Sequence, residues 1–323
     1  MTGDRAAVDR RAVLHTSGLL GLLAAVPACT SPYARMRLTL ATGGRGGVYY
    51  KLGTALAQAW QEKLDLDVRP EVLETAGSVD NLQLLASGAA DVIFSQIDTA
   101  VEQLSQAVPG DPRALRALAR IYDDFVHVVV PESSSTFTLA ELRGSRVSVG
   151  APNSGVLVIA KRLLMNAGLD PNTDLRARQL DIRGSVDALE NGDIDAFFWS
   201  GGLPTPEVEG LANALPIRLL DLEDVVSAVR ADYPVYAPGT VPAMSYNISE
   251  PITTLTVRNV LLVGAGMADD LANDLVKAMF EAQEQLARTN PAALTINLRA
   301  AIGTQPVPLH PGAVRFFRAS KNS

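Results

Sequence analysis

The fold is decided by two stretches of the sequence, SVDNLQLLASGAADVIFSQ at residues 78–96 and SVDALENGDIDAFFWS at residues 185–200. Each starts with Ser-Val-Asp, continues with a short helical pattern that ends at a glycine, and enters an apolar run that is typical of a buried strand. The two triplets are 107 positions apart, and Gly88 and Gly192 are 104 positions apart. Matches in the same order at a nearly constant spacing indicate that the chain contains two similar units.

The sequence before each stretch predicts the same order of elements. In the first unit, RLTLAT at 37–42 alternates like a strand, and apolar residues then recur at helical spacing, at positions 52, 56, 60 and 64. DVRPEVLET at 67–75 predicts a second strand. In the second unit, RVSVGAPNSGVLVIAKRLLMNAG at 146–168 again predicts a strand, a glycine loop and a helix. The order β-α-β-α-β implies an α/β fold with a mostly parallel sheet flanked by helices.

Two such units predict a two-lobed clamshell. We expect lobe 1 to consist of residues 37–127 and 245–323, and lobe 2 to consist of residues 128–244. The carboxyl ends of the strands and the N-termini of the helices should face one cleft, because ligands of open α/β sheets bind at that edge.

The chain should cross between the lobes at residues 125–131 and again within residues 236–257. The segment at 268–288 predicts an amphipathic helix that packs back on lobe 1. The residues expected to form its buried stripe are Leu271, Leu275, Ala278 and Met279.

The first 28 residues resemble an export signal. Three arginines, at positions 5, 10 and 11, precede a short apolar run at 18–26 and then small residues. The run is much shorter than the roughly 20 apolar residues that a membrane span needs. Arg10 and Arg11 leave the twin-arginine route open beside the general export route. We therefore expect a mature chain in the periplasm or at the outer face of the cytoplasmic membrane, with residues 29–36 as a linker.

Cys29 is the only cysteine in the chain. The segment VPAC that ends at Cys29 resembles a bacterial lipoprotein box, in which this cysteine would be lipidated and would hold the protein at the membrane surface. Cleavage after Ala28 without lipidation is the alternative. In either case no internal disulfide can form, so the stability of the mature chain must come from its core.

Composition and charge exclude several functions. With 323 residues and 47% hydrophobic content, the chain is long enough for two cores. The mature chain carries a net charge of about −8, which repels nucleic acid. Only His127 and His310 remain after export, and the sequence contains no HExxH or Cys-x-x-Cys motif. We expect no metal, no cofactor and no enzymatic activity, although an active site built from carboxylates alone stays open.

The segment TGGRGGVYYKLG at 42–53 raises the question of what a strand end needs so many glycines for. A Walker loop would require Gly-Lys-Ser/Thr, and a dinucleotide fingerprint would require a glycine at position 49, where Tyr49 stands. We expect instead that backbone amides of the loop and the dipole of the following helix receive a carboxylate. A tight turn that merely lets the helix and the strand pack closely is the alternative.

The glycine loops, the helix starts at Ser78 and Ser185, and the ends of the buried strands are the candidate site. From lobe 1 we expect the ligand to contact Thr42, Gly43, Gly44, Arg45, Gly47, Tyr49, Tyr50, Thr75, Gly77, Ser78, Gln96 and Asp98. From lobe 2 we expect contacts by Asn153, Ser154, Gly155, Ser200, Gly201 and Gly202.

Four of these residues have specific alternatives. Successive helical residues are about 100° apart, so only one of Tyr49 and Tyr50 can face the ligand. Asp98 offers a carboxylate to an ammonium group, or it only caps the next helix. Arg45 should form a bidentate pair with a ligand carboxylate, or it only steers anions toward the cleft.

Five motifs together resemble the TAXI family of substrate-binding proteins, the extracytoplasmic receptors of one branch of TRAP transporters. They occur in the same order between about residues 37 and 285: TGGRGGVYYKLG, ETAGSVDNLQLLASGAADVIFSQID, LRGSRVSVGAPNSG, ALENGDIDAFFWSGGLPTP and YAPGTVP. The resemblance implies a periplasmic-binding-protein fold of the second type and a small carboxylate ligand, such as glutamate or 2-oxoglutarate. It also implies delivery to a TRAP membrane permease with fused small and large subunits. Arg45 departs from the family pattern, which more often has a small polar residue at this position.

Three other functions fit the same architecture. The chain could serve an ABC importer, act as a ligand sensor for a membrane kinase, or be an enzyme with a clamshell fold. A receptor would return every ligand unchanged, whereas an enzyme would convert its ligand.

Overall fold

One mixed sheet forms the centre of the structure. The computed structural model describes residues 31–104, 110–111 and 113–321; within them ten strands pair in the order β2-β1-β3-β10-β4-β7-β5-β6, with β8 on β4 and β9 on β10. The strands are β1 (Thr39–Ala41), β2 (Glu71–Leu73), β3 (Val92–Gln96), β4 (Leu115–Pro131), β5 (Arg146–Ser148), β6 (Arg176–Arg178), β7 (Ala196–Gly201), β8 (Ile217–Leu219), β9 (Ala237–Val241) and β10 (Ile252–Gly264). The expected export signal and Cys29 lie outside the described residues.

The two lobes have the same strand order, as the sequence repeat predicts. In lobe 1, β1 pairs in parallel with β2 and β3. In lobe 2, β5 pairs in parallel with β6 and β7. Helices connect the parallel strands: α1 (Val48–Leu64) and α2 (Ser78–Ser87) in lobe 1, and α4 (Gly155–Asn166) and α5 (Ile182–Glu190) in lobe 2. The predicted α/β class is confirmed, and the predicted residue boundaries of the lobes stay predictions.

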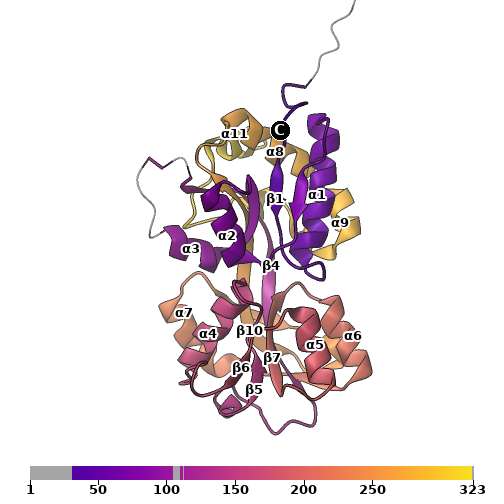
Figure 1. Cartoon of the computed structure of the whole chain (residues 1–323), viewed down its shortest axis with the longest axis vertical. Coiled ribbons are helices and arrows are strands. Elements are labelled where there is room, and N and C mark those ends of the chain that lie inside the picture. The colour runs from indigo at the N-terminus through magenta and orange to yellow at the C-terminus, as the bar shows by residue number, and fades with distance from the viewer. Residues whose placement is uncertain (1–30, 105–109, 112, 322–323) are drawn as a thin grey trace, which may run out of the picture. The chain divides into compact units, whose positions relative to one another are not determined.

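Two long antiparallel strands run from one lobe into the other. Figure 1 shows β4 and β10 side by side between the upper elements around β1 and the lower elements around β5 and β7. β4 includes the predicted first crossing at 125–131. The predicted second crossing at 236–257 is not one extended segment, because β9 and β10 form an antiparallel pair within it. The second strand that runs from one lobe into the other is β10.

Alternation along β3 distributes the core of lobe 1 over both faces of the sheet. Val92 and Phe94 belong to the apolar cluster that contains α1 and α8 (Asp269–Glu281), and Ile93 belongs to the cluster that contains α2. Trp60 of α1 is fully buried, and its indole nitrogen donates to the carbonyl oxygen of Leu275 at 3.0 Å. The predicted apolar residues of α1, at positions 52, 56, 60 and 64, are all buried. The predicted stripe on α8, at positions 271, 275, 278 and 279, is buried too, so both predictions are confirmed.

The late helix is not continuous over 268–288. It ends at Glu281, and α9 (Gln283–Thr289) follows after Ala282. The expected linker is also not free of contacts, because the hydroxyl of Tyr33 donates to Asp274 at 2.8 Å. The remaining α-helices are α3 (Ile97–Leu104), α6 (Pro206–Ala214), α7 (Glu223–Asp232), α10 (Leu298–Ala301) and α11 (Pro311–Ala319).

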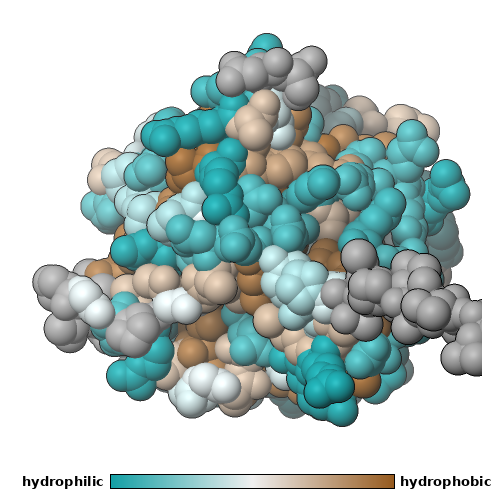
Figure 2. All heavy atoms as spheres, turned by 90° about the horizontal axis from the view of Figure 1, so that it is seen from above, coloured by the Kyte–Doolittle hydropathy of each residue, from teal (hydrophilic) through white to brown (hydrophobic). Residues whose placement is uncertain are grey.

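The surface seen from above is mostly hydrophilic, with hydrophobic residues visible in small areas between the polar ones (Figure 2). Scattered apolar residues of this kind are usual on protein surfaces. Within residues 31–104, 110–111 and 113–321, no helix is both long enough and apolar enough to cross a membrane.

Candidate ligand-binding site

A pocket of about 310 Å³ lies where the carboxyl ends of the parallel strands of both lobes meet. Lobe 1 contributes the segment after β1, the segment after β2 and the end of β3; lobe 2 contributes the loops after β5 and β6 and the end of β7. This is the edge of the sheet at which α/β proteins bind ligands. The volume is near the lower limit of about 300 Å³ for small-molecule pockets, which suits a small ligand.

Most of the predicted site residues line this pocket. Those that do are Gly43, Gly44, Arg45, Gly47, Tyr49, Thr75, Gly77, Ser78, Gln96, Ser154, Gly155, Ser200 and Gly201. Those that do not are Thr42, Tyr50, Asp98, Asn153 and Gly202. Lining the pocket does not test contact with a ligand, so the contact roles stay predictions.

The helix starts at the pocket differ between the lobes. In lobe 1, α1 begins after Gly47 and α2 begins after Gly77, and neither has a side-chain cap. In lobe 2, Ser154 caps α4 by accepting from the amide of Leu157, and Asp181 caps α5. The lobe 1 helices therefore retain amide groups in the first turn that no side chain caps, and their dipoles favour an anion at this position. In α2, Asp80 already places a carboxylate in the first turn, and its amide donates to the carbonyl oxygen of Asn153 at 3.1 Å.

Of the two predicted helix starts, Ser78 is confirmed and Ser185 is wrong, and neither serine caps its helix. Ser78 is the first residue inside α2, and its hydroxyl accepts from the backbone amide of Gln96 at 3.0 Å. Ser185 lies within α5, where its hydroxyl is 2.8 Å from that of Ser148. Helix α5 starts earlier than predicted, at Ile182, because Asp181 caps it.

The floor of the pocket is a buried polar cluster of Gln96, Asp124 and Ser200. The amide nitrogen of Gln96 donates to Asp124 Oδ2 at 3.0 Å and to the hydroxyl of Ser200 at 2.8 Å. Ser200 in turn donates to Asp124 Oδ2 at 3.2 Å. Burial raises the pKa of Asp124 to about 6, although hydrogen bonds from Gln96, Asn259 and Ser200 act in the opposite direction.

Tyr49, and not Tyr50, is the tyrosine of the pair that lines the pocket. Its ring stacks on Phe94 with 5.0 Å between centroids and meets the edge of Tyr122 at 6.3 Å. The hydroxyl of Tyr49 donates to the side-chain oxygen of Asn259. Burial raises the pKa of Tyr49 well above its usual value, and the nearby Asp124 adds to the effect. The phenol therefore stays neutral and forms a rigid apolar wall.

The opening of the pocket carries two arginines with different surroundings. Arg45 Nε donates to Glu74 Oε2 at 2.8 Å, its guanidinium lies 5.3 Å from the centre of the Tyr50 ring, and its side chain is 63% exposed. Arg183 of α5 also lines the pocket, and within the described part of the chain it forms no hydrogen bond or ion pair. Arg183 thus brings a positive charge to the pocket, and this charge helps to lower the pKa of the nearby Glu74.

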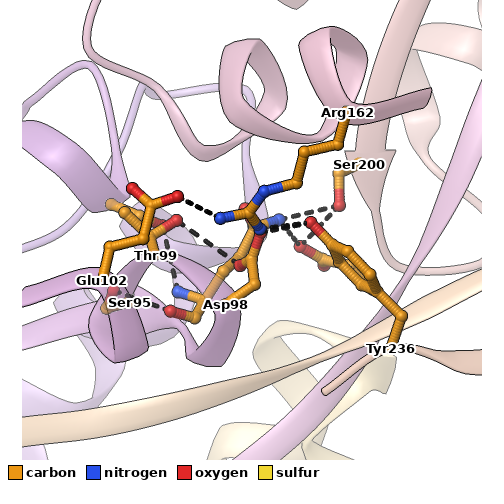
Figure 3. A network of polar contacts seen from close by, with 10 residues as sticks. Ser95, Asp98, Thr99, Glu102, Arg162, Ser200 and Tyr236 are labelled. Atoms are coloured by element: carbon orange, nitrogen blue, oxygen red, sulfur yellow. Dashed lines mark hydrogen bonds and ion pairs between the residues drawn. The ribbon is translucent and has the colours of Figure 1, made fainter. Parts of the chain in front are cut away.

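Asp98 takes part in an ion pair between the lobes. It is 1% exposed, and Arg162 of α4 donates to its Oδ2 at 2.8 Å. The hydroxyl of Tyr236 donates to the same oxygen at 2.6 Å, and Arg162 also pairs with Glu102 (Figure 3). The guanidinium of Arg162 lies 4.4 Å from the centre of the Tyr233 ring. Asp98 therefore has its own cationic partner and does not line the pocket.

The pocket lining includes charged and polar residues that were not predicted, among them Glu74, Tyr122, Asp124, Asp181 and Arg183. A signal existed for Arg183, because the repeat spacing of 107 places it opposite Ala76, next to the predicted Gly77. Asp124 had no such signal. Among the described residues, no group of three or more His, Cys, Asp and Glu side chains is placed to hold a metal ion.

Comparison with known proteins agrees with this geometry. Residues 40–319 match the model of the NMT1-like family. The chain belongs to the NMT1-like family. Its fold is the α/β fold of periplasmic binding proteins, with helices that flank a central sheet.

Three solved structures illustrate the likeness. A protein from Bordetella bronchiseptica RB50 has 19% sequence identity and a TM-score of 0.51, over 88% of this chain and 90% of that chain. A periplasmic transporter has 15% identity and a TM-score of 0.52, over 89% and 93%. An ancestral arginine-binding protein bound to arginine has 14% identity and a TM-score of 0.50, over 79% and 98%. At these identities the likeness shows the fold alone.

Proposed function

We propose that this protein is an extracytoplasmic solute receptor that binds one small organic anion between its two lobes and delivers it to a membrane permease. The ligand would be an amino acid such as glutamate or a dicarboxylate such as 2-oxoglutarate. One observation carries the proposal: the pocket brings the uncapped starts of α1 and α2 from lobe 1 together with the guanidinium of Arg183 from lobe 2.

The physical argument rests on where negative charge is stabilised. Uncapped amides and helix dipoles at α1 and α2 favour an anion, but each dipole contributes only about 0.3 to 1 kcal/mol where it is exposed. A guanidinium that approaches from the other lobe adds charge-assisted hydrogen bonds of about 1.5 to 3 kcal/mol. The two contributions combine only when the lobes are close together, so the anion links ligand binding to closure of the cleft.

The permease is proposed to be of the TRAP type, because five motifs in order resemble the TAXI receptors. An ABC importer is the alternative, since periplasmic binding proteins of this fold serve both kinds of transporter. The neighbouring genes distinguish the two: a gene for a large fused permease supports the TRAP proposal, and a gene for an ATPase subunit contradicts it. Uptake of ligand in the absence of ATP, by vesicles that contain the permease, is the direct test.

An enzyme is the second candidate, and Asp124 is the observation that favours it. A buried carboxyl whose pKa is raised to about 6 could act as a general base in a cleft. Purified protein should nevertheless return every bound ligand unchanged. Mass spectrometry of the ligand before and after a long incubation decides this, because conversion at a rate that depends on Asp124 would contradict the receptor proposal.

Thermal shift measurements with amino acids and small dicarboxylates test ligand binding. A ligand at about a hundred times its dissociation constant should stabilise the protein by roughly 2.7 kcal/mol. Hits among these anions and none among sugars would support the proposal. Stabilisation by sugars or metal ions, and by no organic anion, would contradict it.

The location of the protein is tested separately, because Cys29 and the export signal lie outside the described residues. We propose that residues 1–28 are removed on export, and that the mature protein is either lipid-anchored through Cys29 or free in the periplasm. Mass spectrometry of the native N-terminus distinguishes an acylated Cys29 from an unmodified one. An intact residue 1 in the mature protein would contradict export by this signal.

A further inference from the structure

Two buried acceptor atoms in the pocket floor have no donor. Asp124 and Gln96 are each 3% exposed and both line the pocket. Asp124 Oδ1 and Gln96 Oε1 have no hydrogen-bond partner among the described residues. Buried polar atoms in native proteins are nearly always hydrogen-bonded, so two such atoms in one pocket indicate that a bound molecule provides the donors.

Gln96 and Ser200 do not provide a donor for Asp124 Oδ1. The amide nitrogen of Gln96 and the hydroxyl of Ser200 both already donate to the other carboxylate oxygen, Asp124 Oδ2. Tyr122 and Asn259 also act on Asp124 as hydrogen-bond donors and lower its pKa, and Asn259 Nδ2 is a buried donor with no other hydrogen-bond partner among the described residues. Reversing the Gln96 amide would bring its oxygen against Asp124 Oδ2, so the observed orientation is the favourable one.

The charges of the pocket separate into two regions. The floor presents the carboxylate of Asp124 and the carbonyl oxygen of Gln96, which are both acceptors. The opening presents Arg183, the uncapped starts of α1 and α2, the ion pair of Arg45 with Glu74, and Asp181, which caps α5. A ligand with two negative ends would place one of them beside Asp124, where like charges repel at low dielectric. A ligand with one cationic end and one anionic end matches both regions.

We propose that Asp124 determines the specificity of this site by binding an ammonium group of the ligand, with Gln96 Oε1 as the second acceptor. The inference rests on the proposed function, because it assigns one end of the same ligand. The carboxylate of that ligand lies toward Arg183 and the helix starts. The pocket therefore selects amino acids over carboxylates of the same length that lack the amine.

Matched ligands test the proposal without any substitution. Calorimetry on the full mature protein first identifies binders among the twenty common amino acids, and each binder is then compared with its counterpart that lacks the amine. Glutarate is the counterpart of L-glutamate, and succinate is the counterpart of L-aspartate. Charge-assisted hydrogen bonds of this kind correspond to about tenfold to a hundredfold in affinity, so the amino acid should bind at least about tenfold more tightly.

Asp124→Asn assigns this preference to one residue. The introduced amide would turn its oxygen toward Gln96 and Ser200 and its nitrogen toward the pocket, which replaces an acceptor by a donor. The variant should lose the preference for the amino acid or reverse it, because the partner of the ammonium group is lost and the repulsion of the dicarboxylate counterpart is removed. Asp123→Asn is the matched control, because Asp123 is the preceding residue of β4, pairs with Arg120 and does not line the pocket. This control should keep the preference of the parent protein.

The outcomes separate this inference from the proposed function. Equal or tighter binding of glutarate or succinate by the parent protein would overturn the role of Asp124 and leave the receptor proposal intact. An unchanged preference in Asp124→Asn would do the same. Failure of every amino acid and every small carboxylate to bind would overturn both proposals.

Discussion

Gln96 and Ser200 occupy equivalent positions in the two copies of the repeat, and their side chains meet. The amide nitrogen of Gln96 lies 2.8 Å from the hydroxyl oxygen of Ser200, and the residues are 104 positions apart, the same spacing as Gly88 and Gly192. Each residue lies at the carboxyl end of a buried strand, at the cleft edge of its own lobe. The repeat therefore explains why the two lobes contact each other through corresponding strands.

Gly155→Ala should prevent this close approach of the lobes. A methyl group at Gly155 would lie 1.8 Å from Gln96 Oε1 and 3.0 Å from the hydroxyl of Ser78, both of which belong to lobe 1. Crowding of this kind costs about 1 to 3 kcal/mol, so the affinity for the ligand should fall by roughly tenfold or more. Calorimetry measures the affinity, and small-angle scattering should show less compaction with ligand than in the parent protein.

Gly44→Ala is the control for that substitution. Gly44 also lines the pocket, but a methyl group there would meet no atom within 4 Å. Its affinity should stay within about threefold of the parent value. If Gly155→Ala binds as tightly as Gly44→Ala, the contact between Gln96 and lobe 2 is not required for binding.

Local patterns in the sequence predict the helices and the parallel strands because each pattern reflects the burial of one face. The spacing of Leu52, Leu56, Trp60 and Leu64 is a property of one helix, and all four side chains are buried as expected. The repeat adds the correspondence between the lobes, since equivalent segments fold in the same way. These inferences need no knowledge of distant contacts.

A local sequence pattern does not tell which of Asp123 and Asp124 faces the interior of the protein. Alternation along β4 requires that adjacent residues face opposite sides, but it does not tell which of two aspartates faces inward. Pairing with β7 and β10 decides it: Asp124 becomes 3% exposed, and Asp123 pairs with Arg120. Asp98 likewise has a partner, Arg162, that lies 64 positions away. Long-range charge pairs follow from tertiary structure and not from spacing.

Removing one partner of the buried pair Asp98 and Arg162 should strongly destabilise the protein. Arg162 is 7% exposed in its side chain; burial disfavours its charge, but Tyr236 and Asp98 outweigh this effect and raise its pKa. Asp98→Ala leaves a buried cation with less compensation, which should lower the free energy of unfolding by about 3 to 5 kcal/mol. Urea denaturation of the variant and of the parent protein measures the difference.

Glu284→Ala provides the comparison for an exposed ion pair. Glu284 and Arg288 lie 3.6 Å apart on α9, with side chains that are 88% and 80% exposed. This substitution should change the free energy of unfolding by less than about 0.5 kcal/mol. Equal effects of Asp98→Ala and Glu284→Ala would show that the pair between the lobes does not stabilise the fold.

The pH dependence of stability should reveal opposing contributions from His127 and Asp124. His127 is fully buried, and burial lowers its pKa to about 4, so the unfolded chain binds a proton near pH 6.5 that the folded chain rejects. Its contribution is present above pH 6.5 and is lost as the pH falls toward 4. The pKa of Asp124 is raised to about 6, so its contribution is present below about pH 4 and is lost as the pH rises through 6. Each amounts to about 3 kcal/mol, in opposite directions.

Asp124→Asn isolates the histidine contribution. In the ligand-free state, the variant should gain up to about 3 kcal/mol over the parent protein above pH 6, and the two should converge near pH 4. Urea denaturation at half-unit steps between pH 4.5 and 7.5 measures both curves, with Asp123→Asn as the control that follows the parent. Curves that stay parallel over the whole range would mean that Asp124 does not hold a proton in the folded protein at pH 5.

Arg183 and Arg45 should differ in their effect on ligand binding, because Arg45 donates a hydrogen bond to a carboxylate of the protein. Arg45 already pairs with Glu74 at 2.8 Å and is 63% exposed, whereas Arg183 lines the pocket and acts on Glu74 only through its charge. Arg183→Ala should weaken binding by about tenfold to a hundredfold, mainly through faster dissociation and with modest dependence on salt.

Direct contact of Arg45 with the ligand predicts the same loss for Arg45→Ala. Steering by Arg45 predicts instead a small loss that lies in the association rate and disappears as salt rises. Stopped-flow kinetics of both variants at two salt concentrations distinguish these roles, and an affinity of Arg45→Ala within a factor of two of the parent would exclude direct contact by Arg45.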